Sequence, residues 1–212
     1  MNLIPELLQA VLLTLTGLAS AIWIGSARRG YGEPDQPALF SALLAFSLAA
    51  GTGACATARL ALGADTLEAE RWLLQATLLL GLPLVGVVAL TLSRRWVWSR
   101  PTWGRVVIGL CAFFELARQL GWSAPYALSL GLLSALLVVY AGLLQWPARL
   151  QAAAGLTGGA LLMALLPWGG LLLSSSPLQA YQQLWLALAV PIIAWLLLHL
   201  PGNLREESPA PT

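Results

Sequence analysis

The ionisable residues with the most informative spacing lie in an apolar stretch that we expect to form a helix over residues 106–122. Glu115 and Arg118 are three positions apart there, so their side chains can pair on one helix face. From a helix start near Val106, Glu115 lies about 13 Å along the axis, near the centre of a bilayer, where a carboxylate facing lipid is costly. We therefore expect Glu115 to face the interior of a helix bundle and to pair with Arg118.

Two interpretations of this pair are open. It is either an internal ion pair that fixes helix packing, or a site for a proton, an ion or a polar substrate, because ionisable groups inside a membrane often line pathways. Cys111 and Trp122 extend the stripe at helical spacing, and polar side chains of a preceding helix are candidate neighbours. The candidate intramembrane polar site comprises Glu115, Arg118, Gln119, Cys111, Gln75 and Thr77.

The residue types that carry most enzyme chemistry are nearly missing. The chain holds one His, two Cys and no Lys, which is too few for the His and Cys clusters of metal or haem sites. Cys55 and Cys111 lie in different apolar segments, without a CxxC spacing, and there is no Gly-rich phosphate loop. We therefore expect no enzymatic activity, no metal site and no cofactor.

The composition predicts a helical membrane fold. Of 212 residues, 58% are hydrophobic and 9% charged, against about 25% charged in soluble domains, and the mean hydropathy is +0.78. A membrane-crossing helix needs roughly 20 apolar residues. Seven stretches predict an all-α, polytopic bundle of seven transmembrane helices: 3–24, 38–62, 72–92, 106–122, 126–144, 150–173 and 184–200. We assign residues 1–201 to one helix-bundle domain and 202–212 to a disordered cytoplasmic tail.

Arginine residues are distributed unequally among the predicted links, and basic short loops stay in the cytoplasm. The first, third and fifth links and the tail hold Arg28, Arg29, Arg94, Arg95, Arg100, Arg149 and Arg205. The second link holds Asp65, Glu68 and Glu70, with Arg71 at its edge. This distribution predicts a multi-pass protein of the cell inner (plasma) membrane with its N-terminus outside and its C-terminus inside.

Small residues and prolines predict how the helices pack. Residues 49–58 are all Ala, Gly, Thr or Cys, so a neighbouring helix can approach closely, and we expect this helix inside the bundle. Pro83, Pro191 and the Pro167-Trp168 pair predict kinks, because proline cannot donate the helical hydrogen bond. Kinks in transmembrane helices can line a cavity or act as hinges.

Seven short-looped helices with this orientation resemble the microbial rhodopsin family. Residues 29–42 are similar to the link between the first two helices of that family, and residues 72–80, a Trp followed by polar residues and a Leu run, resemble its third helix. Pro167-Trp168 is similar to the proline and aromatic residue of the retinal pocket. The resemblance implies a cavity or hinge role for Trp72, Pro167, Trp168 and Pro191.

The chain departs from that family at the residues that matter for light absorption. The retinal-binding lysine of the seventh helix has no counterpart, because the matching window is Ala189-Val190-Pro191-Ile192 and the chain has no Lys. The carboxylate that precedes the third-helix tryptophan is replaced by Arg71. The resemblance therefore implies neither covalent retinal nor light-driven pumping.

The function that the sequence favours is a non-enzymatic, opsin-like sensor, ligand-binding or accessory protein of the inner membrane without covalent retinal. The alternative is a small-solute or proton-coupled transporter that uses the Glu115–Arg118 pair, although the internal repeats typical of small carriers are missing. Expected partners are membrane lipids, a small-molecule or lipid ligand, and further copies of the chain. A net charge of +2 gives no reason to expect nucleic acid.

Overall fold

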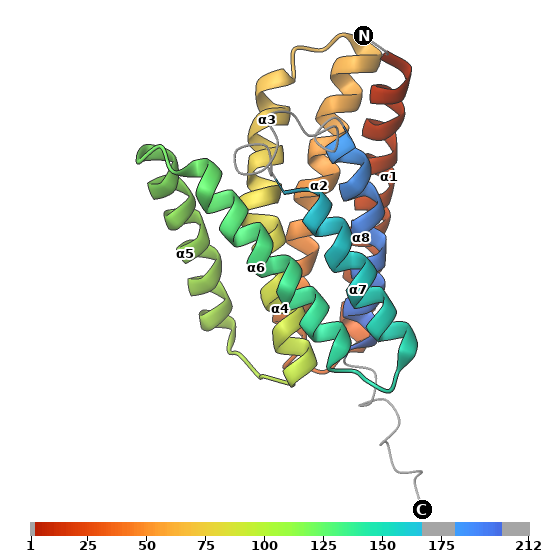
Figure 1. Ribbon diagram of the computed structural model, residues 1–212, viewed down its shortest axis with the longest axis vertical. Coiled ribbons are helices and arrows are strands. Elements are labelled where there is room, and N and C mark those ends of the chain that lie inside the picture. The colour runs from red at the N-terminus through yellow and green to blue at the C-terminus, as the bar shows by residue number, and fades with distance from the viewer. Residues whose placement is uncertain (1–2, 167–180, 201–212) are drawn as a thin grey trace, which may run out of the picture.

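The computed structural model describes residues 3–166 and 181–200, and this part of the chain is helical without a strand (Figure 1). The elements in chain order are α1 (Leu3–Ala27), η1 (Arg28–Gly30), α2 (Gln36–Leu62), α3 (Leu67–Ala76), η2 (Thr77–Gly81), α4 (Leu82–Arg94), α5 (Arg100–Gln119), α6 (Ser123–Leu143), α7 (Arg149–Ala164) and α8 (Gln182–His199). The predicted all-α fold is confirmed for the described residues. Pro167, Trp168 and the predicted tail at 202–212 lie outside them.

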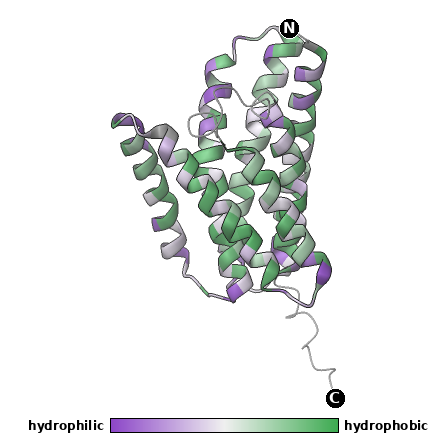
Figure 2. Ribbon diagram, in the orientation of Figure 1, coloured by the Kyte–Doolittle hydropathy of each residue, from purple (hydrophilic) through white to green (hydrophobic). Residues whose placement is uncertain are grey.

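Within residues 3–166 and 181–200, five helices are long and apolar enough to cross a membrane. They are Ile4–Gly30, Gln36–Leu62, Leu67–Arg94, Pro125–Leu143 and Gln182–His199, of which the third joins α3, η2 and α4 into one continuous helix. The two remaining helices do not meet these criteria: α5 carries four charged residues, and the described part of α7 has 16 residues. Hydrophilic residues gather near the two ends of the bundle, with mostly hydrophobic helix between them (Figure 2).

Helix α5 begins six residues earlier than the sequence predicted, at Arg100 rather than Val106. Ser99 before it is extended, with ψ 155°, and Pro101 occupies the first turn, where its missing N–H leaves no helical bond unmade. The helix ends at Gln119, so the predicted range 106–122 was displaced toward the C-terminus. This displacement changes the position of every residue in the predicted polar site along the helix.

A π-helical turn, η2, separates α3 from α4 where the sequence predicted a kink. Pro83 is the second residue after this turn and cannot donate to the carbonyl of Leu79, so the backbone before it widens to re-satisfy its hydrogen bonds. Within the turn, the Thr77 hydroxyl donates to the Leu73 carbonyl and lies 3.2 Å from the hydroxyl of Thr52. The helix therefore continues through the predicted kink, and the π-helical turn changes the helical register of the residues that follow it.

The core is built from close contacts between small residues. A Cβ added to Gly53 of α2 would lie 2.6 Å from the backbone nitrogen of Thr14 in α1, and one added to Gly17 of α1 would lie 2.8 Å from the nitrogen of Ala50. Across α6 and α7, a Cβ on Gly142 would lie 2.6 Å from the Cα of Gly155. The predicted place of the small-residue helix inside the bundle is confirmed, and the α1–α2 and α6–α7 seams are backbone-to-backbone contacts.

Helix α5 packs less closely than these pairs and stands at the edge of the bundle (Figure 1). Its buried residues are Trp103 and Ala117, while large apolar side chains such as Ile108 and Phe113 are exposed. A Cβ added to Gly104 or Gly109 would meet nothing within 4 Å. The space beside α5 is therefore open enough to form the grooves described below.

Candidate functional site

The predicted Glu115–Arg118 pair forms at the C-terminal end of α5. The Arg118 guanidinium donates to both carboxylate oxygens of Glu115, at 2.9 Å from Nε and 2.7 Å from Nη2, and the Gln119 amide donates to the same carboxylate at 3.0 Å. The i, i+3 spacing thus predicted the pairing correctly.

The expectation that Glu115 faces the bundle interior is wrong. Its side chain is 42% exposed and that of Arg118 is 47% exposed. Because α5 starts at Arg100 and its buried face carries Trp103 and Ala117, the pair falls in the last turns of the helix and points away from the core. Cys111 is exposed as well, and Trp122 precedes α6 instead of continuing the stripe on α5.

The structure brings only some of the other predicted residues to this pair. The Arg118 guanidinium lies 5.2 Å from the centre of the Trp72 ring of α3, a cation–π contact between the two helices. Thr77 is buried at the α2 interface instead, and Gln75 is exposed on α3. Pro191 lies inside α8, which continues through it to His199. The predicted six-residue polar site therefore divides between an exposed cluster on α5 and a buried hydroxyl pair.

A second ion pair is better enclosed. The Arg59 side chain of α2 donates to Glu70 of α3 at 2.7 Å, and the Gln183 amide of α8 donates to the same carboxylate at 3.2 Å. The Glu70 side chain is only 11% exposed. Of the acidic residues Glu68 and Glu70 in the predicted second link, Arg59 pairs with Glu70. This cluster connects three helices, which is the arrangement of an interaction that stabilises the fold.

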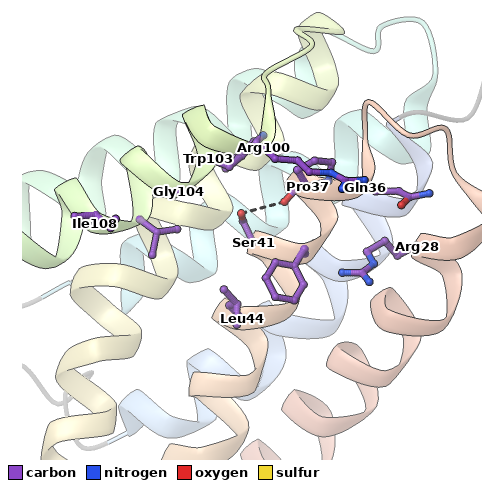
Figure 3. A pocket seen from close by; sticks show the side chains of 11 residues that line it. Arg28, Gln36, Pro37, Ser41, Leu44, Arg100, Trp103, Gly104 and Ile108 are labelled. Atoms are coloured by element: carbon purple, nitrogen blue, oxygen red, sulfur yellow. Dashed lines mark hydrogen bonds between the residues drawn. The ribbon is translucent and has the colours of Figure 1, made fainter.

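A groove of about 620 Å³ lies between α2 and α5, at the end of the bundle where both helices begin (Figure 3). Figure 3 shows Arg28 and Gln36 on one side of it and Trp103, Gly104 and Ile108 on the other. Its lining residues are Arg28, Gln36, Pro37, Phe40, Ser41, Leu44, Arg100, Trp103, Gly104, Val107 and Ile108. We call this cavity the α2–α5 groove.

The polar side chains that line the groove differ in whether they have a hydrogen-bond partner in the chain. The Gln36 amide donates to the Tyr31 carbonyl and the Ser41 hydroxyl to the Pro37 carbonyl, so both have a partner in the chain. The Arg28 guanidinium lies 5.2 Å from the centre of the Phe40 ring, and its Nε is buried without a hydrogen-bond partner. A buried donor without an acceptor is costly, so Arg28 is the group in the groove that most needs an acceptor.

The chemistry of the groove is that of an amphipathic anion site. Two arginines lie at its mouth, no acidic residue lines it, and its walls are mainly apolar. The sequence does not predict this site, because Arg28 and Arg100, which indicate the orientation of the helices, are far apart in the chain. Arg28 reaches the groove through the short helix η1, and Arg100 through the early start of α5.

Metal ligands do not gather in the described part of the chain, where no three His, Cys, Asp or Glu side chains lie close enough to hold an ion. Comparisons with protein-family models, curated proteins and solved structures find no match for this chain, so its own geometry has to support the functional conclusion.

Proposed function

We propose that this chain is a multi-pass protein of the inner membrane that crosses it seven times, with its N-terminus outside, and binds an amphipathic ligand in the α2–α5 groove without enzymatic activity. The observation that carries the proposal is the groove itself, with cationic groups at one end and apolar walls beyond them. Ligand sites in proteins combine a mostly apolar lining with a few placed polar groups, in cavities of about 300–1,000 Å³.

The charges at the two ends of the bundle support the proposed orientation. The end where α2 and α5 begin carries Arg28, Arg29, Arg94, Arg95, Arg100, Arg105 and Arg149, together with Glu33 and Asp35. The opposite end carries Arg59, Arg71 and Arg118 together with Glu6, Asp65, Glu68, Glu70 and Glu115. Under the positive-inside rule, the first end is cytoplasmic.

The path of the chain supports seven crossings. In Figure 1, α5 and α7 each run from the arginine-rich end toward the opposite end, alternating with their neighbours in the sequence. Together with the five long apolar helices, they make up the seven passes that we propose. The exposed apolar side chains of α5, such as Ile108 and Phe113, suit a helix in contact with lipid.

The interior of the bundle gives less support to an opsin-like ligand site. The described space beside Thr77, Leu186 and Val190 has a volume of about 10 Å³ and is lined mainly by apolar residues, which is room for about one water molecule. The transporter alternative also lacks support, since the side chains of the Glu115–Arg118 pair are exposed and do not line a described cavity. The groove is therefore the better candidate for ligand binding.

The test of ligand binding fills the groove without disturbing the fold. Gly104→Phe places a ring in it, and Gly109→Phe is the matched control, because neither glycine has a neighbour within 4 Å of an added Cβ and Gly109 is outside the lining. We expect mass spectrometry of the purified protein to find an amphipathic molecule with the wild type and Gly109→Phe, and to lose it with Gly104→Phe. Retention of the molecule by Gly104→Phe contradicts the proposal.

The test of orientation uses single cysteines in a background with Cys55 and Cys111 changed to Ala. An impermeant maleimide added to intact cells should label Leu67→Cys, at the end of the bundle proposed to be outside, and spare Val97→Cys. Labelling of Val97→Cys and protection of Leu67→Cys would reverse the orientation.

A further inference from the structure

We propose that the α2–α5 groove binds an anionic phospholipid of the cytoplasmic leaflet, with Arg28 and Arg100 holding the headgroup phosphate and the apolar walls holding the upper part of one acyl chain. This assignment rests on the proposed function, because it requires the arginine-rich end of the bundle to be cytoplasmic. It names the ligand class that the groove selects.

The headgroup end of the groove has the donors that a phosphate diester needs. Arg28 has an enclosed Nε without an acceptor, and its guanidinium is positioned against the ring of Phe40. A guanidinium presents its N–H groups as a planar fork that matches two phosphate oxygens, so we expect the terminal N–H groups of Arg28 to hold a bound phosphate. Arg100 supplies a second cation from the facing helix.

The backbone favours the same charge. Both α2 and α5 begin beside the mouth of the groove, with Gln36 and Arg100 as their first residues. Helix N-termini stabilise anions through their free N–H groups and the helix dipole. The acidic residue next to the mouth is Asp35, which interacts with Arg95 and does not line the groove. Burial raises the pKa of Asp35, and the nearby Arg95 opposes this effect.

The apolar end of the groove suits an acyl chain that continues into the bilayer. Phe40 and Leu44 of α2 face Val107 and Ile108 of α5 across it, and Ile108 is 70% exposed. A cavity of about 620 Å³ is smaller than a whole diacyl lipid. The groove therefore takes the headgroup and the start of one chain, and leaves the rest of the lipid in contact with the outer face of α5.

The binding of a lipid here also has a consequence for packing. No glycine contact like those of the α1–α2 seam holds α5 to α2, so a lipid seated between them fills space that the protein leaves open. A ligand that binds only the folded state stabilises it, and the stabilisation grows with the logarithm of the ligand concentration above its dissociation constant. We therefore expect anionic lipid to raise the thermal stability of the purified protein.

The experiment titrates delipidated full-length protein with phosphatidylglycerol or phosphatidylcholine of identical acyl chains, followed by native mass spectrometry and thermal unfolding. We expect tighter binding of phosphatidylglycerol, and a loss of about tenfold in its affinity for Arg28→Gln and for Arg100→Gln, as expected for one charge-assisted hydrogen bond each. Arg149→Gln is the matched control, because it removes the same charge from an exposed site at the same end of the bundle. Arg28→Lys keeps the charge but not the fork, and should be intermediate.

Different outcomes identify which proposal fails. Equal binding of both lipids that is blocked by Gly104→Phe overturns the anionic-lipid assignment and leaves the groove as a ligand site. Binding that Gly104→Phe does not affect overturns both proposals. An equal loss with Arg149→Gln, or displacement of phosphatidylglycerol by excess inorganic phosphate, also overturns the assignment, because the first indicates charge alone and the second indicates a site for free phosphate.

Discussion

Glycines in helical conformation have opposite roles in the α1–α2 seam and in α5. Gly53 allows the backbones of α1 and α2 to touch, since an added Cβ would lie 2.6 Å from the Thr14 nitrogen. Gly104 and Gly109 of α5 face open space. Helices in lipid gain little from burying apolar surface against each other and depend on close packing. The comparison indicates that α1 and α2 form a fixed part of the protein, whereas α5 is attached through fewer contacts.

The two ion pairs differ in the same way. Arg59 and Glu70 connect α2 with α3, and Gln183 extends the cluster to α8. Glu115 and Arg118 belong to one helix, and the Arg118 contact with Trp72 is their described link to another element. The same kind of Arg–Glu ion pair therefore connects different helices in one region and lies within a single helix in the other.

The largest expected effect is from filling the α1–α2 seam. Gly53→Leu forces α1 and α2 apart, because the added side chain meets backbone atoms that cannot move alone, and overpacking of this kind costs about 3 kcal/mol. The free energy of unfolding can be measured in SDS by tryptophan fluorescence. Gly109→Leu is the control and should leave stability nearly unchanged. Equal losses for both variants would remove the distinction between the two regions.

The next effect is from breaking the enclosed ion pair. Arg59→Gln leaves Glu70 without its cation, and we expect a loss of about 2 kcal/mol, below the cost for a fully buried pair because the Arg59 side chain is 31% exposed. The same unfolding assay measures it. Adding Glu70→Gln to Arg59→Gln should recover part of the loss. Without such recovery, the loss would have another origin than an unpaired charge.

A smaller effect of opposite sign is expected in α5. Gly109→Ala should stabilise the protein by about 0.5–1 kcal/mol, because alanine loses less backbone entropy in a helix and has room here. Gly53→Ala should instead destabilise it, since even one methyl group is too close to Thr14. Stabilisation by both substitutions would show that the seam can relax.

The smallest expected effect concerns the exposed ion pair. Glu115→Gln and Arg118→Gln should leave the unfolding midpoint within experimental error, because exposed pairs contribute little to stability. A loss as large as that of Arg59→Gln would place the pair in a protein interface, such as one with a second copy of the chain. The comparison is made in one detergent at one salt concentration.

The sequence predicted the helical segments and the pairing of Glu115 with Arg118, since both depend on local composition and spacing. It did not predict where α5 begins, because the residues from Trp96 to Arg105 are polar and aromatic, whereas Ser99 and Pro101 set the helix start. The exposure of the Glu115–Arg118 pair was also not predicted, because the neighbouring helices determine which face of α5 is buried. Arg28 and Arg100 share a groove only through the tertiary fold.

The π-helical turn Thr77–Gly81 makes the helix Leu67–Arg94 sensitive to changes in chain length. The extra residue of such a turn rotates everything after it by about 100° relative to an uninterrupted α-helix. Before the turn, Trp72 meets Arg118 of α5; after it, Gly86 packs against Ser134 of α6. Deleting one residue between 77 and 81 would restore the α-helical register and turn these two contact faces relative to each other. The length of this segment is therefore more constrained than its composition, so families of related chains should tolerate substitutions here better than deletions.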